Sequence, residues 1–102
     1  MPLSLDELWK IVRSIPKGKV MAYGDVGRSL RYPVSGFQVG RWMVRAPEGV
    51  PWWRVVSRTG QLPIAKRGEG LASEQFARLQ QEGVPFVEER VVDMEAASWA
   101  PD

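Results

Sequence analysis

The chain has 102 residues, of which 44% are hydrophobic, and this size and composition predict one folded domain. It contains no cysteine and no histidine, which excludes disulfides, thiolate nucleophiles, imidazole bases and the usual zinc ligands. Residues 1–67 carry 12 Lys/Arg against 4 Asp/Glu, a net charge of +8, whereas residues 68–102 carry 2 against 8, a net charge of −6. The basic part suggests a polyanionic partner, nucleic acid first, and unevenly decorated solvated surface is the alternative.

The first predicted helix spans about residues 5–15. Ser4 and Glu7 form a capping box at its start, and Leu3 can pack onto Leu8. Apolar residues recur at helical spacing and predict one buried stripe: Leu5, Leu8, Trp9, Val12 and Ile15.

Two further helices, joined by a tight turn, are predicted over residues 24–30 and 36–45. Gly24 and Gly27 weaken the first of them, so its stability must come from packing. Ser35 can cap the second. Two such helices, the second ending in arginines, indicate a helix-turn-helix over about residues 24–46.

The second of these helices has distinct faces when its residues are placed about 100° apart. With Phe37 at zero, Arg41, Arg45 and Gln38 follow within about 100°. The apolar residues lie on the opposite side: Val39, Trp42, Met43 and Ala46. Phe37 therefore sits on the basic face, either packed against the preceding turn at Tyr32 or Val34, or as a wedge that enters a base step. The polar residues would contact phosphates and sugars.

The rest of the chain predicts smaller elements. A short strand and a Gly-rich basic loop follow residue 53, and a fourth helix spans residues 72–82, with Gly83 as its stop. Residues 84–94 alternate weakly and predict a small hairpin or wing. The final residues either dock through Trp99 or fray.

Several short segments occur in an order and at a spacing that resemble one family. They are IPKGKVMAYGDVGRSL at 15–30, QVG at 38–40, PWWRVV at 51–56 and EGV at 82–84. Over roughly residues 3–86 the chain is similar to the DNA-binding domain of O6-alkylguanine-DNA alkyltransferases. The active-site signature of that family is Pro-Cys-His-Arg-Val, and here Trp52 and Trp53 stand at the Cys and His positions. This substitution resembles the alkyltransferase-like proteins, in which tryptophan commonly replaces the cysteine.

The resemblance implies a helix-turn-helix that enters the minor groove and a damaged guanine flipped into a pocket beside the former active site. Alkyltransferase-like proteins bind the lesion without removing it and pass it to nucleotide excision repair proteins. Tyr23 matches the tyrosine that helps to flip the base, and Arg67 aligns with an arginine that faces the alkylated base. Phe37 departs from the family, which usually has an arginine finger there; a phenyl ring can stack in its place, and Arg41 is one substitute for the missing charge.

Two sets of site residues follow from the helical wheel and the resemblance together. The expected alkylguanine pocket comprises Tyr23, Pro51, Trp52, Trp53, Arg54 and Arg67. The expected DNA contacts comprise Gly36, Phe37, Gln38, Gly40, Arg41 and Arg45. If residues 52–54 are extended, the two indoles point opposite ways, and one lines the pocket while the other fills the space of the Cys–His pair. The alternative is that both belong to the core.

Alkyl transfer is excluded by the residues at the signature. It needs an activated nucleophile, and Trp52 supplies no nucleophile and Trp53 no base. A carboxylate acting on water, Glu69 or Glu74, is the remaining catalytic alternative, although surface charge explains both. Recognition needs no chemistry, because flipping costs a few kcal/mol, less at a damaged pair, and aromatic stacking contributes about 1–3 kcal/mol per base.

We therefore predict a mainly α-helical single domain over residues 1–102, with a winged-helix-like helix-turn-helix, an active-site-like loop at 50–56 and a short C-terminal hairpin. The predicted function is a non-enzymatic sensor of O6-alkylguanine in double-stranded DNA. The alternatives are a small transcription factor that reads undamaged DNA and a glycosylase or nuclease. No apolar run reaches the roughly 18 residues of a membrane span, and no signal peptide is visible. We expect a cytoplasmic monomer, nucleoid-associated in a bacterium, without metal or cofactor, whose acidic last third is a protein-docking surface or solvated charge.

Overall fold

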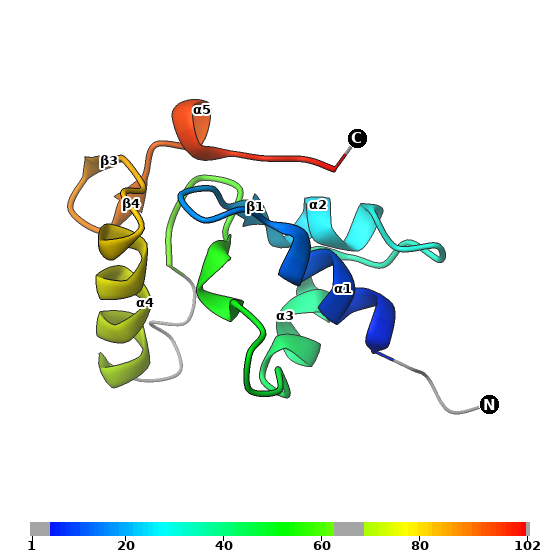
Figure 1. Cartoon of the computed structure of the whole chain (residues 1–102). Coiled ribbons are helices and arrows are strands. Elements are labelled where there is room, and N and C mark those ends of the chain that lie inside the picture. Colours follow the sequence, from blue (N-terminus) through cyan, green and yellow to red (C-terminus); the bar gives the residue numbers. More distant parts are fainter. Residues whose placement is uncertain (1–4, 63–68, 102) are drawn as a thin grey trace.

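The computed structural model describes residues 5–62 and 69–101 (Figure 1). Within these residues, five α-helices and two small two-stranded sheets surround two clusters of buried side chains. This architecture confirms the predicted class, a mainly helical domain with a helix-turn-helix and a C-terminal hairpin. No helix in the described ranges is long and apolar enough to cross a membrane.

Helix α1 (Asp6–Ser14) falls one residue short of its predicted span at each end. Three residues of the predicted stripe are buried within it: Leu8, Trp9 and Val12. Ile15, just after the helix, is buried as well. The predicted capping residue Ser4 and its neighbour Leu3 lie outside the described residues.

The chain then enters β1 (Met21–Ala22), which pairs in parallel with β2 (Val55–Val56). The register aligns Met21 with Val55 and Ala22 with Val56, and all four side chains are buried. Because the strands are parallel, the segments that follow them leave the sheet at the same edge. These segments are helix α2 and the turn at residues 57–60.

Helices α2 (Tyr23–Arg28) and α3 (Gly36–Met43) form the predicted helix-turn-helix. Both end two residues before their predicted ends, because the backbone tightens into three-residue hydrogen bonds. The Leu30 amide donates to the Gly27 carbonyl at 3.3 Å after α2, and the Arg45 amide donates to the Trp42 carbonyl at 2.9 Å after α3. The predicted cap is confirmed, since the Ser35 hydroxyl accepts from the Gln38 amide at 3.2 Å.

Helix α4 (Glu69–Gln81) begins three residues before its predicted start and ends one residue before its predicted end. Gly83 follows it with a positive φ of 83°, the conformation expected of a C-terminal glycine. Strands β3 (Phe86–Glu88) and β4 (Val91–Val92) then form the predicted antiparallel hairpin.

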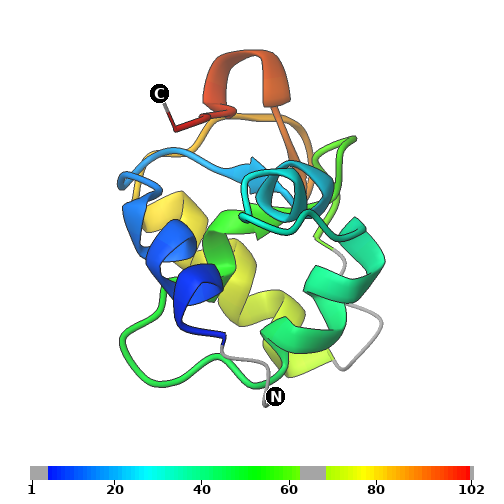
Figure 2. The same cartoon turned by 90° about the vertical axis from the view of Figure 1, so that its right-hand side faces the viewer.

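The C-terminal segment docks rather than frays. Asp93 caps the short helix α5 (Met94–Ala97), which the sequence did not predict, by accepting from the Ala96 amide at 3.2 Å. The Trp99 amide then donates to the Val20 carbonyl at 2.9 Å, which ties the tail beside β1. Figures 1 and 2 both show this last segment, in red, running past the blue strand.

Two groups of buried residues form the interior. The first core lies among α1, α2 and α3 and comprises Leu8, Trp9, Val12, Ile15, Met21, Val26, Val39, Met43, Val50 and Val55. The second core lies against α4 and the hairpin and comprises Val20, Val56, Leu62, Leu79, Val84, Val92 and Ala97. Figure 1 shows the segment with the two tryptophans, in green, between α4 on one side and α1 to α3 on the other.

Candidate nucleic-acid interface

Glycines set the distance between the two helices of the helix-turn-helix. A Cβ at Gly27 would lie 2.2 Å from the Val34 carbonyl oxygen, and a Cβ at Gly36 would lie 2.8 Å from the Gly24 nitrogen. Neither separation is compatible with a side chain, because the opposing atoms belong to the backbone. Gly27, which weakens α2 as an isolated helix, is therefore required for close packing against the turn before α3, and Gly36 at the start of α3 is required for its close approach to the α2 backbone.

The basic face of α3 is open to solvent. Phe37 is 78% exposed, which contradicts the alternative in which it packs into the preceding turn. Arg41 and Arg45 are also exposed, and neither forms an ion pair with any described residue. The opposite face behaves as predicted at Val39 and Met43, which are buried. A largely exposed aromatic ring therefore shares this face with two arginines that form no ion pair within the described part of the chain.

Tyr23 lies next to this face, at the first position of α2. The space where a Gly40 side chain would begin is 3.8 Å from the Tyr23 ring, so the ring lies over the middle of α3. Tyr23 is half-buried and packs against the first core. The structure thus brings together Tyr23, Gly36 and Gly40, which the sequence had divided between a pocket and a DNA-contacting helix.

The two tryptophans do not lie on an extended segment. Residues Trp52–Arg54 form one 3-10 turn, η1, in which the Arg54 amide donates to the Pro51 carbonyl at 3.1 Å. The indoles meet edge to face, with ring centroids 5.9 Å apart and planes at 86°. Trp52 packs against the first core and Trp53 against the second, and both remain partly exposed. The expectation that residues 52–54 are extended was therefore wrong. That one of the two indoles lines the lesion pocket stays a prediction.

Arg54 is held inside the protein. Its guanidinium forms an ion pair with Glu82, with an Nη2–Oε2 distance of 2.7 Å, and donates to the Ile15 carbonyl at 2.8 Å. The side chains of Arg54 and Glu82 are only 15% and 8% exposed. The Trp53 indole N–H donates to the same Glu82 carboxylate at 2.9 Å. Because its guanidinium is occupied by Glu82 and Ile15, Arg54 holds the tryptophan loop in place, and any contribution to the predicted pocket is through the position of that loop.

These contacts keep Glu82 ionised. Burial alone would raise the pKa of the carboxyl, but hydrogen bonds from Arg54 and Trp53 outweigh it and lower the pKa below its ordinary value of 4.5. A carboxylate whose pKa is lowered and whose oxygens accept hydrogen bonds from Arg54 and Trp53 is a poor general base. Glu82 therefore has a structural role.

Sequence reasoning missed two groups of residues here. Gln75 is fully buried, and its side-chain nitrogen donates to the Trp53 and Val55 carbonyls at 3.1 Å each, which fastens η1 to α4. Its place on the same helical stripe as Ala72 and Leu79 was the available signal. Arg28 and Arg58 converge on Gly24, and no pattern within the sequence connects them.

Other predicted sites are placed as follows. Arg67 lies outside the described residues, as does most of the basic loop, and the side chain of Glu69 is not among those that the structure describes. Glu74 is exposed and pairs with Arg78 at 2.9 Å, in agreement with surface charge. Among the described residues, no group of three Asp or Glu side chains is arranged to hold a metal ion.

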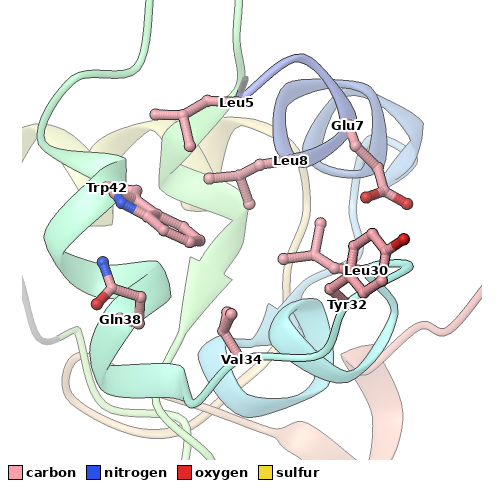
Figure 3. A pocket seen from close by; sticks show the side chains of 8 residues that line it. All are labelled: Leu5, Glu7, Leu8, Leu30, Tyr32, Val34, Gln38 and Trp42. Carbon is pink, nitrogen blue, oxygen red and sulfur yellow. The ribbon is translucent and has the colours of Figure 1, made fainter. Parts of the chain in front are cut away.

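A cavity of about 400 Å³ opens between α1, the turn after α2, and α3 (Figure 3). It is lined by Leu5, Glu7, Leu8, Leu30, Tyr32, Val34, Gln38 and Trp42. Figure 3 shows the apolar side chains from α1 and α3 turned toward one another across it. No described residue of the predicted alkylguanine pocket lines this cavity, so it is a separate feature of the helix-turn-helix.

Comparisons with known proteins connect this arrangement with DNA. Residues 5–84 match the family described as the 6-O-methylguanine DNA methyltransferase, DNA-binding domain. The chain is 37% identical over 94 residues to a DNA base-flipping protein of Escherichia coli, covering 90% of this chain and 70% of that protein. It is 38% identical over 81 residues to alkyltransferase-like protein 1 of Schizosaccharomyces pombe, covering 76% and 73%.

A solved structure shares the fold. The Schizosaccharomyces pombe protein Atl1, crystallised with damaged DNA that contains O6-carboxymethylguanine, superposes with a TM-score of 0.73. The two sequences are 29% identical, and the match covers 97% of this chain and 100% of the other.

Proposed function

This chain belongs to the alkyltransferase-like proteins, which contain the 6-O-methylguanine DNA methyltransferase DNA-binding domain, and from that membership we propose that it binds O6-alkylguanine in duplex DNA, extrudes the damaged base and leaves the alkyl group in place. The observation that carries the proposal is the loop at residues 51–56. Two indoles stand there, where alkyl transfer requires a nucleophile and a base, and the chain has no cysteine or histidine elsewhere.

The carboxylates near the loop support a protein without catalytic activity. Glu82, the one beside the tryptophans, is held by Arg54 and Trp53, and its lowered pKa makes it a weak base. Glu74 is on the surface and paired with Arg78. Neither carboxylate is free to activate water.

Recognition of the lesion follows from two aromatic contacts. An alkyl group on O6 weakens pairing of the guanine, so extrusion of the damaged base costs less than the few kcal/mol needed for a normal one. Phe37, which is 78% exposed on the basic face, is suited to enter the gap that the base leaves. Each stacked base gains about 1–3 kcal/mol. Tyr23 beside it is placed to help the nucleotide rotate.

Removal of the lesion must then fall to other proteins, because a binder without turnover leaves the alkyl group in the DNA. We assign that step to nucleotide excision repair proteins. Such a contact would suit the exposed acidic residues of the C-terminal third, which belong to the acidic part of the sequence, whereas α3 belongs to the basic part. They are Glu88, Glu89 and Glu95.

The proposal is tested by titrating the protein with a duplex that contains one O6-methylguanine and with the undamaged twin. We expect tighter binding to the damaged duplex. Tyr23→Ala should weaken binding to the damaged duplex more than binding to the undamaged one, whereas Arg13→Ala, at an exposed position on α1, should change neither. Equal affinity of the wild-type protein for both duplexes would instead favour a transcription factor that reads undamaged DNA.

A further inference from the structure

Two arginines from distant parts of the sequence approach the same point beside Tyr23. A Cβ at Gly24 would lie 3.6 Å from Nη1 of Arg28 and 3.9 Å from Nη2 of Arg58. The absence of a side chain at Gly24 therefore leaves an open space that both guanidinium groups border. Neither arginine was among the residues that the sequence indicated for DNA binding.

The sheet register explains the convergence. Ala22 pairs with Val56 in the parallel sheet, and Gly24 and Arg58 each follow two residues later, so both emerge at the same edge. Figure 2 shows the turn after β2, in yellow-green, next to the cyan helix α2. The register of the buried strands thus brings the Arg58 backbone close to Gly24, and one turn of α2 brings Arg28, four residues after Gly24, to the same point.

The turn that carries Arg58 is rigid. The Gly60 amide donates to the Ser57 carbonyl at 3.0 Å, and the Ser57 amide donates to the Gln61 carbonyl at 3.0 Å. The Ser57 hydroxyl also accepts from the Gln61 amide at 2.9 Å. Gly60 has a φ of 87° and closes the turn against Val92, where a Cβ would lie 2.3 Å from the carbonyl oxygen. A side chain on such a turn loses little backbone entropy when it binds.

The charges at this point are not balanced within the protein. Arg58 is exposed and has no ion pair or hydrogen bond to another residue in the described ranges. Arg28 pairs with Asp25, but the two side chains are 62% and 48% exposed, and such surface pairs contribute little. Two guanidinium groups held near one point repel each other, and an anion between them removes that repulsion. Guanidinium groups bind phosphate oxygens in two-pronged geometry at about 2.7–2.9 Å.

We propose that Arg28 and Arg58 form a binding site for one backbone phosphate of the lesion-carrying strand, directly beside the extruded nucleotide. The position follows from the neighbours of Gly24. Tyr23 precedes it, and Gly36, at the start of the helix that carries Phe37, packs against it. With Phe37 in the duplex and Tyr23 at the nucleotide, the two guanidinium groups face the strand that is being bent outward. This inference rests on the proposed function, because it assumes that the basic face meets DNA.

The test combines neutralised phosphates with arginine variants of the full-length protein. Duplexes with one O6-methylguanine carry a single methylphosphonate at successive linkages on either side of the lesion, on each strand. Dissociation constants are measured for the wild-type protein, Arg58→Ala, Arg28→Ala and the control Arg13→Ala. Arg58→Lys retains the charge without the two-pronged geometry and serves as a second variant. Thermal unfolding verifies that each variant is folded.

We expect Arg58→Ala to weaken binding about tenfold and to reduce the slope of log K against log salt by about 0.9, the value of one phosphate. One methylphosphonate on the lesion strand should weaken wild-type binding by a similar factor and should not weaken Arg58→Ala further. Arg28→Ala should respond at the same linkage, and Arg58→Lys should fall between wild type and Arg58→Ala. The phosphate site would be overturned if the loss of affinity from the methylphosphonate multiplied with the loss from Arg58→Ala at every linkage. It would also be overturned if both arginine variants bound the damaged duplex as tightly as the wild-type protein.

The same data separate this inference from the proposed function. The ratio of wild-type affinities for damaged and undamaged duplexes reports on lesion recognition alone. The coupling between Arg58 and one linkage reports on the phosphate site alone. A preserved preference for the lesion without coupling would reject the site and leave the proposed function intact.

Discussion

The arginines of the two halves of this molecule have opposite surroundings. Around the helix-turn-helix, Arg41, Arg45 and Arg58 are exposed and make no ion pair with a described residue. Near α4, Arg54 is buried against Glu82, and Arg78 lies 4.4 Å over the Trp53 ring while it pairs with Glu74. Arg28 pairs with Asp25, but both side chains are largely exposed, unlike the buried Arg54–Glu82 pair. We therefore expect the exposed arginines of the helix-turn-helix to contribute to binding and the buried Arg54 to contribute to folding.

The tryptophan turn is where the two halves join. Trp52 packs against the first core and Trp53 against the second, with their rings in contact. The turn is fastened to α4 by Gln75 and to Ile15 by Arg54. The loop that holds reactive groups in an alkyltransferase is here a packed joint, and changes on either side of it should have different consequences.

The largest effect is expected from Glu82→Ala, which leaves the buried Arg54 guanidinium without its carboxylate. Removal of one partner of a buried pair costs about 3–5 kcal/mol of unfolding free energy. Glu74→Ala is the matched control, because that pair is 43% exposed on both sides and should contribute less than about 1 kcal/mol. Equal losses in urea unfolding would remove the distinction between buried and exposed arginines.

The next effect is expected from Gly27→Ala, which forces a Cβ to within 2.2 Å of the Val34 carbonyl oxygen. Overpacking of this kind typically costs about 1–3 kcal/mol. Gly70→Ala, on the exposed side of α4 with nothing within 4 Å, should instead stabilise by about 0.5–1 kcal/mol. Thermal unfolding of both variants checks the signs, and a neutral Gly27→Ala would mean that α2 and the turn at Val34 do not pack as closely as described.

Phe37→Ala should separate binding from stability. The ring is 78% exposed, so we expect the free energy of unfolding to change by less than about 0.5 kcal/mol. If the ring stacks between bases, binding to damaged DNA should weaken by about 1–3 kcal/mol. Val44, which is 64% exposed, supplies the control Val44→Ala. Unchanged DNA binding of Phe37→Ala would exclude the wedge.

The pH dependence of stability should report on Glu82. Because its pKa is lowered in the folded protein, the carboxylate contributes stability above its ordinary value of 4.5, and this contribution is lost as the pH falls through the lowered pKa. Glu82→Gln should therefore reduce the loss of stability on acidification below about pH 4.5. Parallel unfolding curves for both proteins between neutral and acidic pH would contradict the lowered pKa.

The smallest effects are expected from the exposed arginines of α3. Arg41→Gln and Arg45→Gln should each weaken binding to damaged and undamaged duplexes alike, since phosphate contacts carry no information about the base. Each should reduce the salt slope by about 0.9. A loss confined to damaged DNA would show that one of them contacts the lesion.

Local signals predicted the elements that depend on local chemistry. Ser35 as a cap, Gly83 as a helix stop and the hairpin after it follow from backbone hydrogen bonds and conformations that a few neighbouring residues decide. The stripe of α1 and the two faces of α3 follow from helical geometry. The helix ends were less accurate, because tightened last turns depend on what the chain packs against next.

The site depended on contacts that no local pattern contains. The tryptophan turn is compact because Gln75, more than 20 residues away, binds the Trp53 carbonyl. Arg54 was assigned to a pocket on the strength of a motif, whereas Glu82 and Ile15 decide where its guanidinium lies. Arg28 and Arg58 meet through the register of two-residue strands, which sequence alone did not reveal.

The fate of the alkyl group after binding tests the central claim most directly. A duplex with one O6-methylguanine is incubated with an excess of protein, and both the nucleosides of the recovered DNA and the mass of the protein are measured. We predict intact O6-methylguanine in an uncut strand and an unmodified protein. Restored guanine, a released base, a nick or a methylated protein would contradict the claim that this protein binds the lesion without repairing it.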